Sequence, residues 1–192
     1  MEWQTTWDDP FTAYLMQFDS LLGDARTRTT FTATVTGILA AGSLVCQRMA
    51  AASPVLAAVQ NGGQRVIRML TGESTKRSPD LDAAHLTAKL RTRAVEHLAT
   101  TSTDELWLIA DGSDLRKPQA RDMPHLMCVK ALDGRLVNGY RTLNVLGITP
   151  HRRGVLYHRL FSSKAPGFVS EPHEVHQALQ TVSQAIAPSK SR

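Results

Sequence analysis

Apolar residues recur every three or four positions through much of the first hundred residues, a period that predicts α-helices. The spacing holds over residues 15–22. It continues for four turns over residues 35–49, which predicts one amphipathic helix with a single buried face. Ser53 followed by Pro54 is typical of the start of a short helix, since serine caps a helix and proline fits its first turn. Another helix is expected over residues 83–98, after a polar stretch at 71–79 that is typical of a linker or an exposed loop.

After residue 103 the apolar period changes to two, which is typical of β-strands. Residues 106–110 (LWLIA) form a continuous apolar run and predict a strand buried on both faces. Residues 126–132 and 135–148 flank Asp133-Gly134, which indicates a β-hairpin because glycine tolerates a positive φ. A strand over residues 154–161 and a helix capped by Ser170 complete the order.

This order predicts an α+β protein in two parts. Residues 1–100 form an all-helical region, and residues 104–192 form a three-stranded antiparallel meander with a helix. The two cysteines lie 82 residues apart without zinc-ligand spacing, which argues against a zinc site and against a disulfide-stapled secreted domain. The N-terminus lacks the pattern of a signal peptide, and the longest apolar stretch is too short to span a bilayer. We therefore expect a cytoplasmic protein with no membrane partner.

Positive charge is concentrated in one stretch of the chain. The net charge is +5, but residues 115–164 contain ten lysines and arginines against only Asp122 and Asp133, which leaves that stretch at +8. Such a local charge favours a polyanion such as nucleic acid, although a solubilising surface would give the same pattern. The residues of this stretch that we expect to contact DNA are Arg116, Lys117, Arg121, Arg152 and Arg153.

A second candidate DNA contact lies in the helical region. Residues 43–70 fit a helix-turn-helix, with residues 44–49 in the supporting helix and residues 61–70 in the helix that faces DNA. Arginine and glutamine at helical spacing read base edges or hold phosphates. The alternative is a plain helical hairpin with a solvated basic face, and Arg26 and Arg28 likewise contact phosphates or are simply exposed. The side chains that the helix would present are Asn61, Gln64, Arg65 and Arg68.

Asp111 is the leading candidate for metal chemistry. It follows the LWLIA run directly and precedes Gly112-Ser113-Asp114. A carboxylate at the end of a central strand is held rigidly towards an open edge, which suits a divalent cation. The alternative is a turn in which the aspartate accepts hydrogen bonds from the following backbone amides. Trp107 and Tyr140 are expected to pack within the sheet, with base stacking by Tyr140 as the alternative.

Residues 104–187 resemble the front half of DDE-type insertion-sequence transposases with an RNase-H-like catalytic domain. The similarity rests on ELWLIADGSDLRKPQARDMPHL, KALDGRLVNGYRTLNVLG and GVLYHRLFSS, in that order. Residues 20–100 resemble the helical DNA-binding region that precedes that domain. The resemblance implies double-stranded DNA at insertion-sequence ends as partner, in a bacterial cytoplasm. It also implies metal-assisted DNA cleavage and strand transfer with two Mg²⁺ (or Mn²⁺) ions about 3.5–4 Å apart.

Within this resemblance Asp111 takes the place of the first catalytic aspartate and metal ligand. Asp114 either shapes the loop or is itself that ligand. The family adds a second aspartate on a later strand and a glutamate on a later helix, but the last acidic residue here is Glu174. Neither Glu171 nor Glu174 is expected to reach the strand that carries Asp111. The sequence therefore predicts a truncated, catalytically incomplete transposase. The alternative is a non-catalytic DNA-binding remnant that occupies element ends as a homo-oligomer or pairs with intact transposase.

Overall fold

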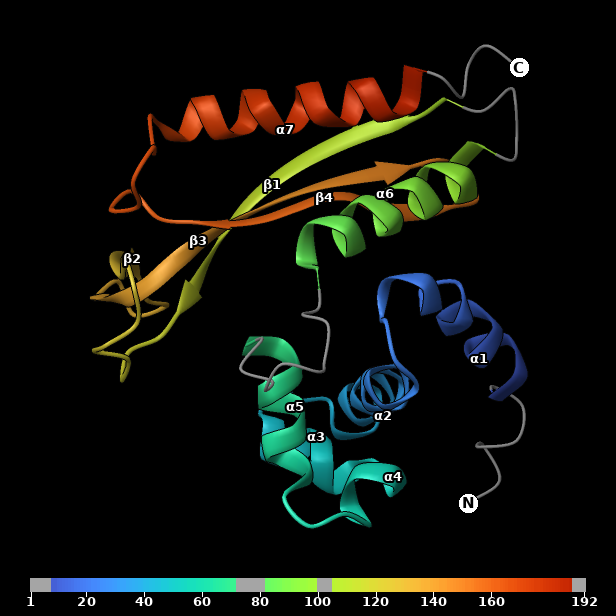
Figure 1. Ribbon diagram of the computed structural model, residues 1–192. Helices are drawn as coiled ribbons and strands as arrows, with labels where there is room; N and C mark the ends of the chain where they lie inside the picture. Colours follow the sequence, from blue (N-terminus) through green and yellow to red (C-terminus); the bar gives the residue numbers. More distant parts are fainter. Residues whose placement is uncertain (1–7, 72–81, 100–104, 188–192) are drawn as a thin grey trace. The chain divides into compact units, whose positions relative to one another are not determined.

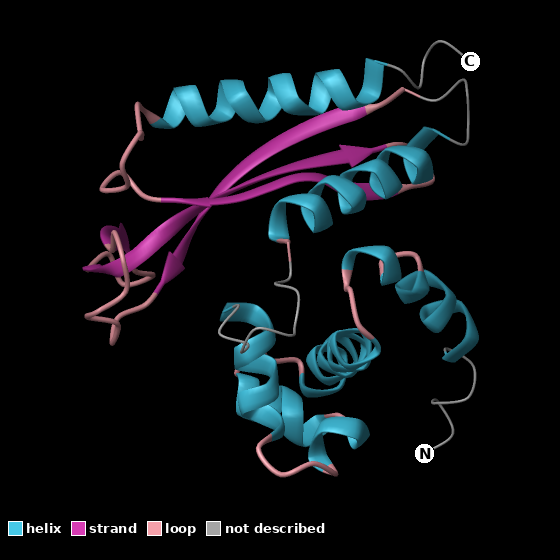
Figure 2. Ribbon diagram, viewed as in Figure 1, coloured by secondary structure: helices cyan, strands magenta, loops and turns pink. Residues whose placement is uncertain are grey.

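A computed structural model describes residues 8–71, 82–99 and 105–187 of the chain. The predicted linker at 71–79 therefore falls outside the described residues, apart from its first position. The chain divides into two compact units, Met1–Thr87 and Ala88–Arg192, and each is described here by itself. Helices make up the first unit, whereas all the described strands belong to the second (Figure 2). The prediction of an α+β protein with an antiparallel sheet is confirmed, but the sheet has four described strands and is not the three-stranded meander expected.

The first unit contains a series of short helices around one long helix (Figure 1). The predicted spacing over residues 15–22 is confirmed, because Leu15, Phe18 and Leu22 are all buried. A second cluster joins Met49, Val66 and neighbouring apolar side chains from the other helices. The helices that lie wholly within this unit are α1 (Asp8–Met16), the 3-10 helix η2 (Asp19–Leu21), α2 (Ala25–Ala41), α3 (Cys46–Ala52), α4 (Pro54–Ala57) and α5 (Gly62–Thr71).

The single helix predicted over residues 35–49 is wrong. Helix α2 ends at Ala41 because Gly42 adopts a left-handed backbone with φ of 55°, and its N–H bonds to the Ile38 carbonyl. Helix α3 then starts at Cys46, and its axis lies at 94° to that of α2. The repeat continued through the break because both helices happen to carry apolar residues in phase. Two members of that repeat, Leu39 and Val45, are exposed.

Helix α2 buries threonine and small residues in place of that apolar stripe. The buried hydroxyls of Thr30 and Thr34 each donate to a carbonyl four residues earlier, as Thr34 does to Thr30 at 2.7 Å. The hydroxyls are thereby satisfied, and the methyl groups pack. Gly37 brings α2 and α3 together, since a Cβ at this position would lie 2.2 Å from the Met49 carbonyl oxygen. The buried residues of α2 are Thr27, Thr30, Ala33, Thr34 and Gly37.

The second unit is an antiparallel sheet with β3 at its centre. Strand β1 pairs with one edge of β3, while β4 and the shorter β2 pair with successive parts of the other edge. The predicted hairpin is confirmed: Gly134 adopts φ of 84° in the turn between β2 and β3. The strands are β1 (Trp107–Arg116), β2 (Met127–Lys130), β3 (Leu136–Ile148) and β4 (Arg153–Phe161).

Two helices cover one face of this sheet. They are α6 (Ala83–Ala99) and α7 (Glu171–Ile186), and α7 starts after the predicted Ser170 cap, which accepts from His173 N–H. Residues paired directly across antiparallel strands point to the same face, and so do residues two apart along a strand. Arg159 of β4 contacts α7 and is paired across the sheet with Leu143 of β3. Leu143 points to the same face as Gly147, four residues further along β3. A Cβ added at Gly147 would touch Leu98 of α6. Both helices therefore lie on the same face.

The opposite face carries no helix of this unit among the described residues, and we call it the open face. Its residues alternate with those of the helix-covered face along β1 and β3, whereas a register shift opposite Val145 and Leu146 interrupts the alternation in β4. Tyr140 of β3 also lies on the side of the open face, but it is buried, and its hydroxyl donates to the Pro124 carbonyl. The open face consists of Trp107, Ile109, Asp111, Ser113, Leu115, Thr142, Asn144, Leu146, Ile148, Arg153, Val155, His158 and Leu160.

The prediction that residues 106–110 form a strand buried on both faces is wrong. Every residue from Trp107 to Ala110 is exposed, and Trp107 retains 66% of its accessible surface. Strand β1 is an edge strand within the described part of the chain, because it pairs with β3 alone and the helices cover only one of its faces. The expectation that Trp107 packs within the sheet is likewise wrong.

Among the helices described, none is by itself both long and apolar enough to cross a membrane. Helices α2 and α3 meet that test of length and composition only when taken together, as a pair bent by 94°.

Candidate nucleic-acid interface

Asp111 lies in the middle of β1 and not at its end. It pairs across the sheet with Asn144, which in turn pairs with His158 of β4, so the three side chains form a row on the open face. His158 Nδ1 lies 2.7 Å from Asn144 Oδ1 and donates to it in the tautomer protonated at Nδ1. The Asp111 carboxylate is exposed and makes no hydrogen bond or ion pair with any residue that the structure describes. The alternative prediction of a turn at Asp111 is wrong, because the residue is paired regularly within β1.

Asp114 lies on the helix-covered face, three positions along β1 from Asp111 and therefore opposite to it. Its Oδ2 accepts from the Lys130 backbone N–H at 3.2 Å, and its Oδ1 lies 3.5 Å from Arg141 Nε. Arg141 also pairs with Glu171 at the start of α7. The two aspartates therefore cannot hold one ion together. Glu171 thus pairs with a residue of β3, on the face that lacks Asp111.

The pair of metal ions implied by the resemblance does not fit the described residues. Hard divalent cations need several oxygen ligands and compensation of their charge. On the open face of the described strands Asp111 is the single carboxylate, with the Asn144 amide oxygen beside it already bonded to His158. In the described ranges no group of three or more His, Cys, Asp or Glu side chains gathers where it could hold a metal ion.

Cations gather where β1 ends and the β2–β3 hairpin turns, and we call this cluster the basic end. Three of its members were predicted from the sequence: one ends β1 and two lie in the loop that follows it. The other two flank the hairpin turn. All five are exposed. The sequence prediction did not include Lys130 and Arg135 among the DNA contacts, although their positions beside the predicted Asp133-Gly134 turn indicate that they lie together. The cluster consists of Arg116, Lys117, Arg121, Lys130 and Arg135.

Backbone contacts fix the basic end in place. Lys117 N–H donates to the Asn138 carbonyl at 2.7 Å, and the Asn138 side chain donates to the Ala120 carbonyl at 2.8 Å. The pKa of Asp133 is lowered from its usual 3.8, chiefly by the side-chain and backbone hydrogen bonds from Arg135, with a smaller effect of the Arg116 charge. Asp133 thus pairs with Arg135, whereas no ion pair joins Arg116 or Lys117 to the described residues.

The other two arginines that were predicted to contact DNA, Arg152 and Arg153, lie at the opposite end of the sheet. Arg152 donates to the His97 carbonyl at 2.7 Å and thereby caps the last turn of α6, which competes with a role in DNA binding. Arg153 is exposed and lies on the open face, in one row with Ile148 and Trp107. Nine residues of β1 separate this row from Arg116, a distance of roughly 30 Å at about 3.3 Å per residue.

The predicted DNA-facing helix corresponds to α5. Residues 53–61, which include α4, separate it from α3, whereas a helix-turn-helix usually has a turn of about 3–4 residues. Gln64 and Arg68 are exposed one turn apart, and Asn61 precedes the helix with φ of 62°. Arg65 is half-buried and donates to Thr30 Oγ1 at 3.3 Å, so it ties α5 to α2. The structure therefore leaves Asn61, Gln64 and Arg68 accessible, and gives Arg65 a packing role.

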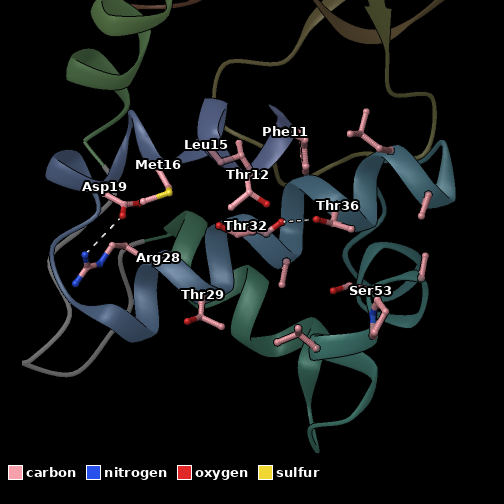
Figure 3. Close-up of a pocket in the computed structure, with 16 residues that line it drawn as sticks. Phe11, Thr12, Leu15, Met16, Asp19, Arg28, Thr29, Thr32, Thr36 and Ser53 are labelled. Carbon is pink, nitrogen blue, oxygen red and sulfur yellow. Dashed lines mark hydrogen bonds and ion pairs between the residues drawn. The ribbon is translucent and has the colours of Figure 1, made fainter. Parts of the chain in front are cut away.

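A cavity of about 890 Å³ lies within the helical unit, bordered by α1, α2 and the start of α4 (Figure 3). Arg28 lies at one end and pairs with Asp19 at 3.6 Å, so it already has a partner within its own unit. Thr36 donates to the Thr32 carbonyl, which leaves its methyl group to line the wall. The cavity is mainly apolar and adds no unpaired cation to the interface.

No protein-family model matches this sequence, and no curated protein matches it either.

Proposed function

We propose that this protein binds duplex DNA and is of the insertion-sequence transposase type, with residues 104–192 forming part of an RNase-H-like domain. The observation that carries the proposal is the basic end, where five exposed cations adjoin the sheet that carries Asp111. The basic end supplies the electrostatic attraction that dominates affinity for duplex DNA. The assignment to the insertion-sequence transposases rests on the resemblance of residues 104–187 to that family.

The order of elements supports the RNase-H-like assignment. Strand β1, which carries Asp111, is followed by the β2–β3 hairpin, the antiparallel strand β4 and helix α7 packed on one face, in the order that the resemblance implies. Asp111 is the residue we assign to the place of the first catalytic aspartate, because it is exposed and unpaired. Asp114 is assigned a structural role, since Arg141 neutralises it on the other face.

The test is an anisotropy titration of a labelled duplex with the full chain. Binding at low salt is expected, and Lys117→Gln should weaken it and reduce the slope of log K against log salt by about 0.9, the contribution of one phosphate contact. Lys89→Gln is the matched control, because it removes the same charge from α6, away from the basic end. Equal effects of the two substitutions, or no binding of duplex at low salt, would refute the proposal.

Metal-dependent cleavage is a second candidate, favoured by the unpaired and exposed carboxylate of Asp111. A bound Mg²⁺ or Mn²⁺ would use this carboxylate, but the described residues provide no further carboxylate on the open face. We therefore expect the chain alone to bind duplex DNA without cutting it. Cleavage in Mn²⁺ that disappears in Asp111→Asn, with DNA affinity retained, would establish the second candidate and refute binding without cleavage.

A further inference from the structure

The open face combines an exposed aromatic ring, hydrogen-bonding side chains and cations at both ends. At one end Trp107 is two-thirds exposed, in one row with Ile148 and Arg153. Four positions further along β1 lies the row that contains Asp111 and Asn144. Among the described residues of this unit no helix covers the indole, because the side chains that contact the helices lie on the other face.

Beyond an apolar row of Ile109, Leu146 and Val155, the open face becomes polar and matches the edges of nucleotide bases. Asp111 is an acceptor that suits an exocyclic amino group, and Asn144 offers its amide N–H₂ while its oxygen accepts from His158. In the next row Ser113 Oγ and Thr142 Oγ1 lie 2.8 Å apart, and Thr142 Oγ1 lies 3.2 Å from the Ser113 carbonyl. These groups lie flat across three strands, a width of about 10 Å.

Cations border this polar patch along the strand direction. Arg153 lies at the Trp107 end of the open face. At the other end the loop after β1 lies over the sheet, held by the Tyr140 hydroxyl on the Pro124 carbonyl, and it carries Arg121 of the basic end. A strand of nucleic acid laid along β1 and β3 would thus meet positive charge at each end and a single carboxylate between.

We propose that the open face binds a segment of unpaired DNA strand, with one base stacked on Trp107. The inference rests on the proposed function, since it names the form of DNA that this sheet takes. A duplex keeps its bases stacked inside, so only an unpaired base offers a free ring face to the indole. Arg153 and the basic end hold the flanking phosphates. Asp111 and Asn144 contact the base edges.

The experiment uses the full chain with Trp3 and Trp7 replaced by phenylalanine, so that Trp107 is the sole tryptophan. Oligo(dT) and a mixed-sequence single strand are the probes, compared with a duplex of the same length. Single strands should quench the Trp107 fluorescence, whereas the duplex should leave it nearly unchanged. By anisotropy, Trp107→Ala in the natural background should weaken single-strand binding roughly 5- to 150-fold, the range for loss of one stacked base.

Three variants separate stacking from other effects. Trp107→Phe should retain most of the affinity, because phenylalanine still offers a ring. Arg153→Gln should weaken single-strand binding without removing the stacking. Leu44→Ala is the control, since it removes an exposed apolar side chain from the helical unit. A thermal melt checks that Trp107→Ala folds like the parent.

Failure of this inference is distinguishable from failure of the proposed function. The inference alone is refuted if duplex binding persists and Trp107→Ala binds single strands as tightly as the parent. It is also refuted, with the proposed function intact, if duplex binding persists and single strands leave the Trp107 fluorescence unchanged. If neither duplex nor single strand binds at low salt, the proposed function falls with it. Weakening by Leu44→Ala equal to that by Trp107→Ala would also overturn the assignment to the open face.

Discussion

Removal of the Arg159 guanidinium should destabilise the sheet unit through the acid that it neutralises. Glu174 lies in the first turn of α7 and is only 3% exposed, and its Oε2 lies 2.9 Å from Arg159 Nη1. The two charges are close without the alignment of a hydrogen bond. Arg159 also donates to Gln177 Oε1 at 3.2 Å, so Arg159→Met removes both of its polar contacts with α7 while keeping an unbranched side chain.

The expected cost follows from the burial of each partner. Breaking a fully buried pair costs about 3–5 kcal/mol because it leaves an uncompensated charge. The Arg159 side chain is 45% exposed, so water already screens part of the interaction, and the helix N-terminus continues to favour the acid. We therefore expect Arg159→Met to lower the free energy of unfolding by about 2 kcal/mol.

The assay is urea unfolding of the parent, both single variants and the double variant Arg159→Met with Glu174→Gln. The double variant should recover part of the loss, since a neutral amide is cheaper to bury than an unpaired carboxylate. A loss in Arg159→Met below about 0.5 kcal/mol, typical of a solvated ion pair, would contradict the reasoning. So would a double variant no more stable than Arg159→Met.

The remaining predictions concern the helical unit and the helix caps. Gly37→Ala places a methyl group 2.2 Å from a backbone carbonyl of α3 and should cost about 1–3 kcal/mol in thermal melts, whereas Gly42→Asn, in a left-handed and open position, should be nearly neutral. Ser170→Ala should cost about 1 kcal/mol by loss of the α7 cap, and Ser170→Asp should retain it; equal losses would contradict the cap. The pKa of Asp24 is lowered from its usual 3.8, chiefly by the backbone N–H of Thr27. Its stabilisation is therefore present above the unfolded pKa and is lost as the pH falls through the lower folded pKa. Asp24→Ser, a cap without charge, should show a smaller loss of melting temperature on acidification below about pH 4, and an unchanged acid profile would refute this.

The parts of the fold that could be predicted have strong local causes. The hairpin was found because Asp133-Gly134 needs a positive φ, which the structure places at Gly134. Helix α7 was found because Ser170, Pro172 and an apolar stripe agree on one start and one face. In both elements the local preference and the tertiary packing give the same answer.

The errors arose where tertiary context decides. The LWLIA run is as apolar as a central strand, yet β1 lies at an edge of the described sheet, and no local pattern distinguishes the two positions. The α2–α3 break was missed because the apolar repeat continues past Gly42, and the threonine face of α2 gives no hydrophobic signal.

Most residues of the candidate site could be chosen from the sequence, but their positions relative to one another could not. Asp111 was expected to be the metal ligand, with Asp114 as the alternative ligand or a loop residue, and strand alternation places the two on opposite faces. The basic stretch was visible in the sequence, whereas only the strand pairing shows that Arg152 and Arg153 lie roughly 30 Å from Arg116 and Lys117.

The salt dependence of duplex binding tests the central claim most directly. The parent and the triple variant Arg116→Gln, Lys117→Gln, Arg121→Gln should be titrated with one labelled duplex at several salt concentrations. If the basic end holds phosphates, the slope of log K against log salt should be smaller in magnitude by about 2.7 in the variant, because three contacts contribute about 0.9 each. Identical slopes for the two proteins, with both folded, would show that DNA does not bind at the basic end.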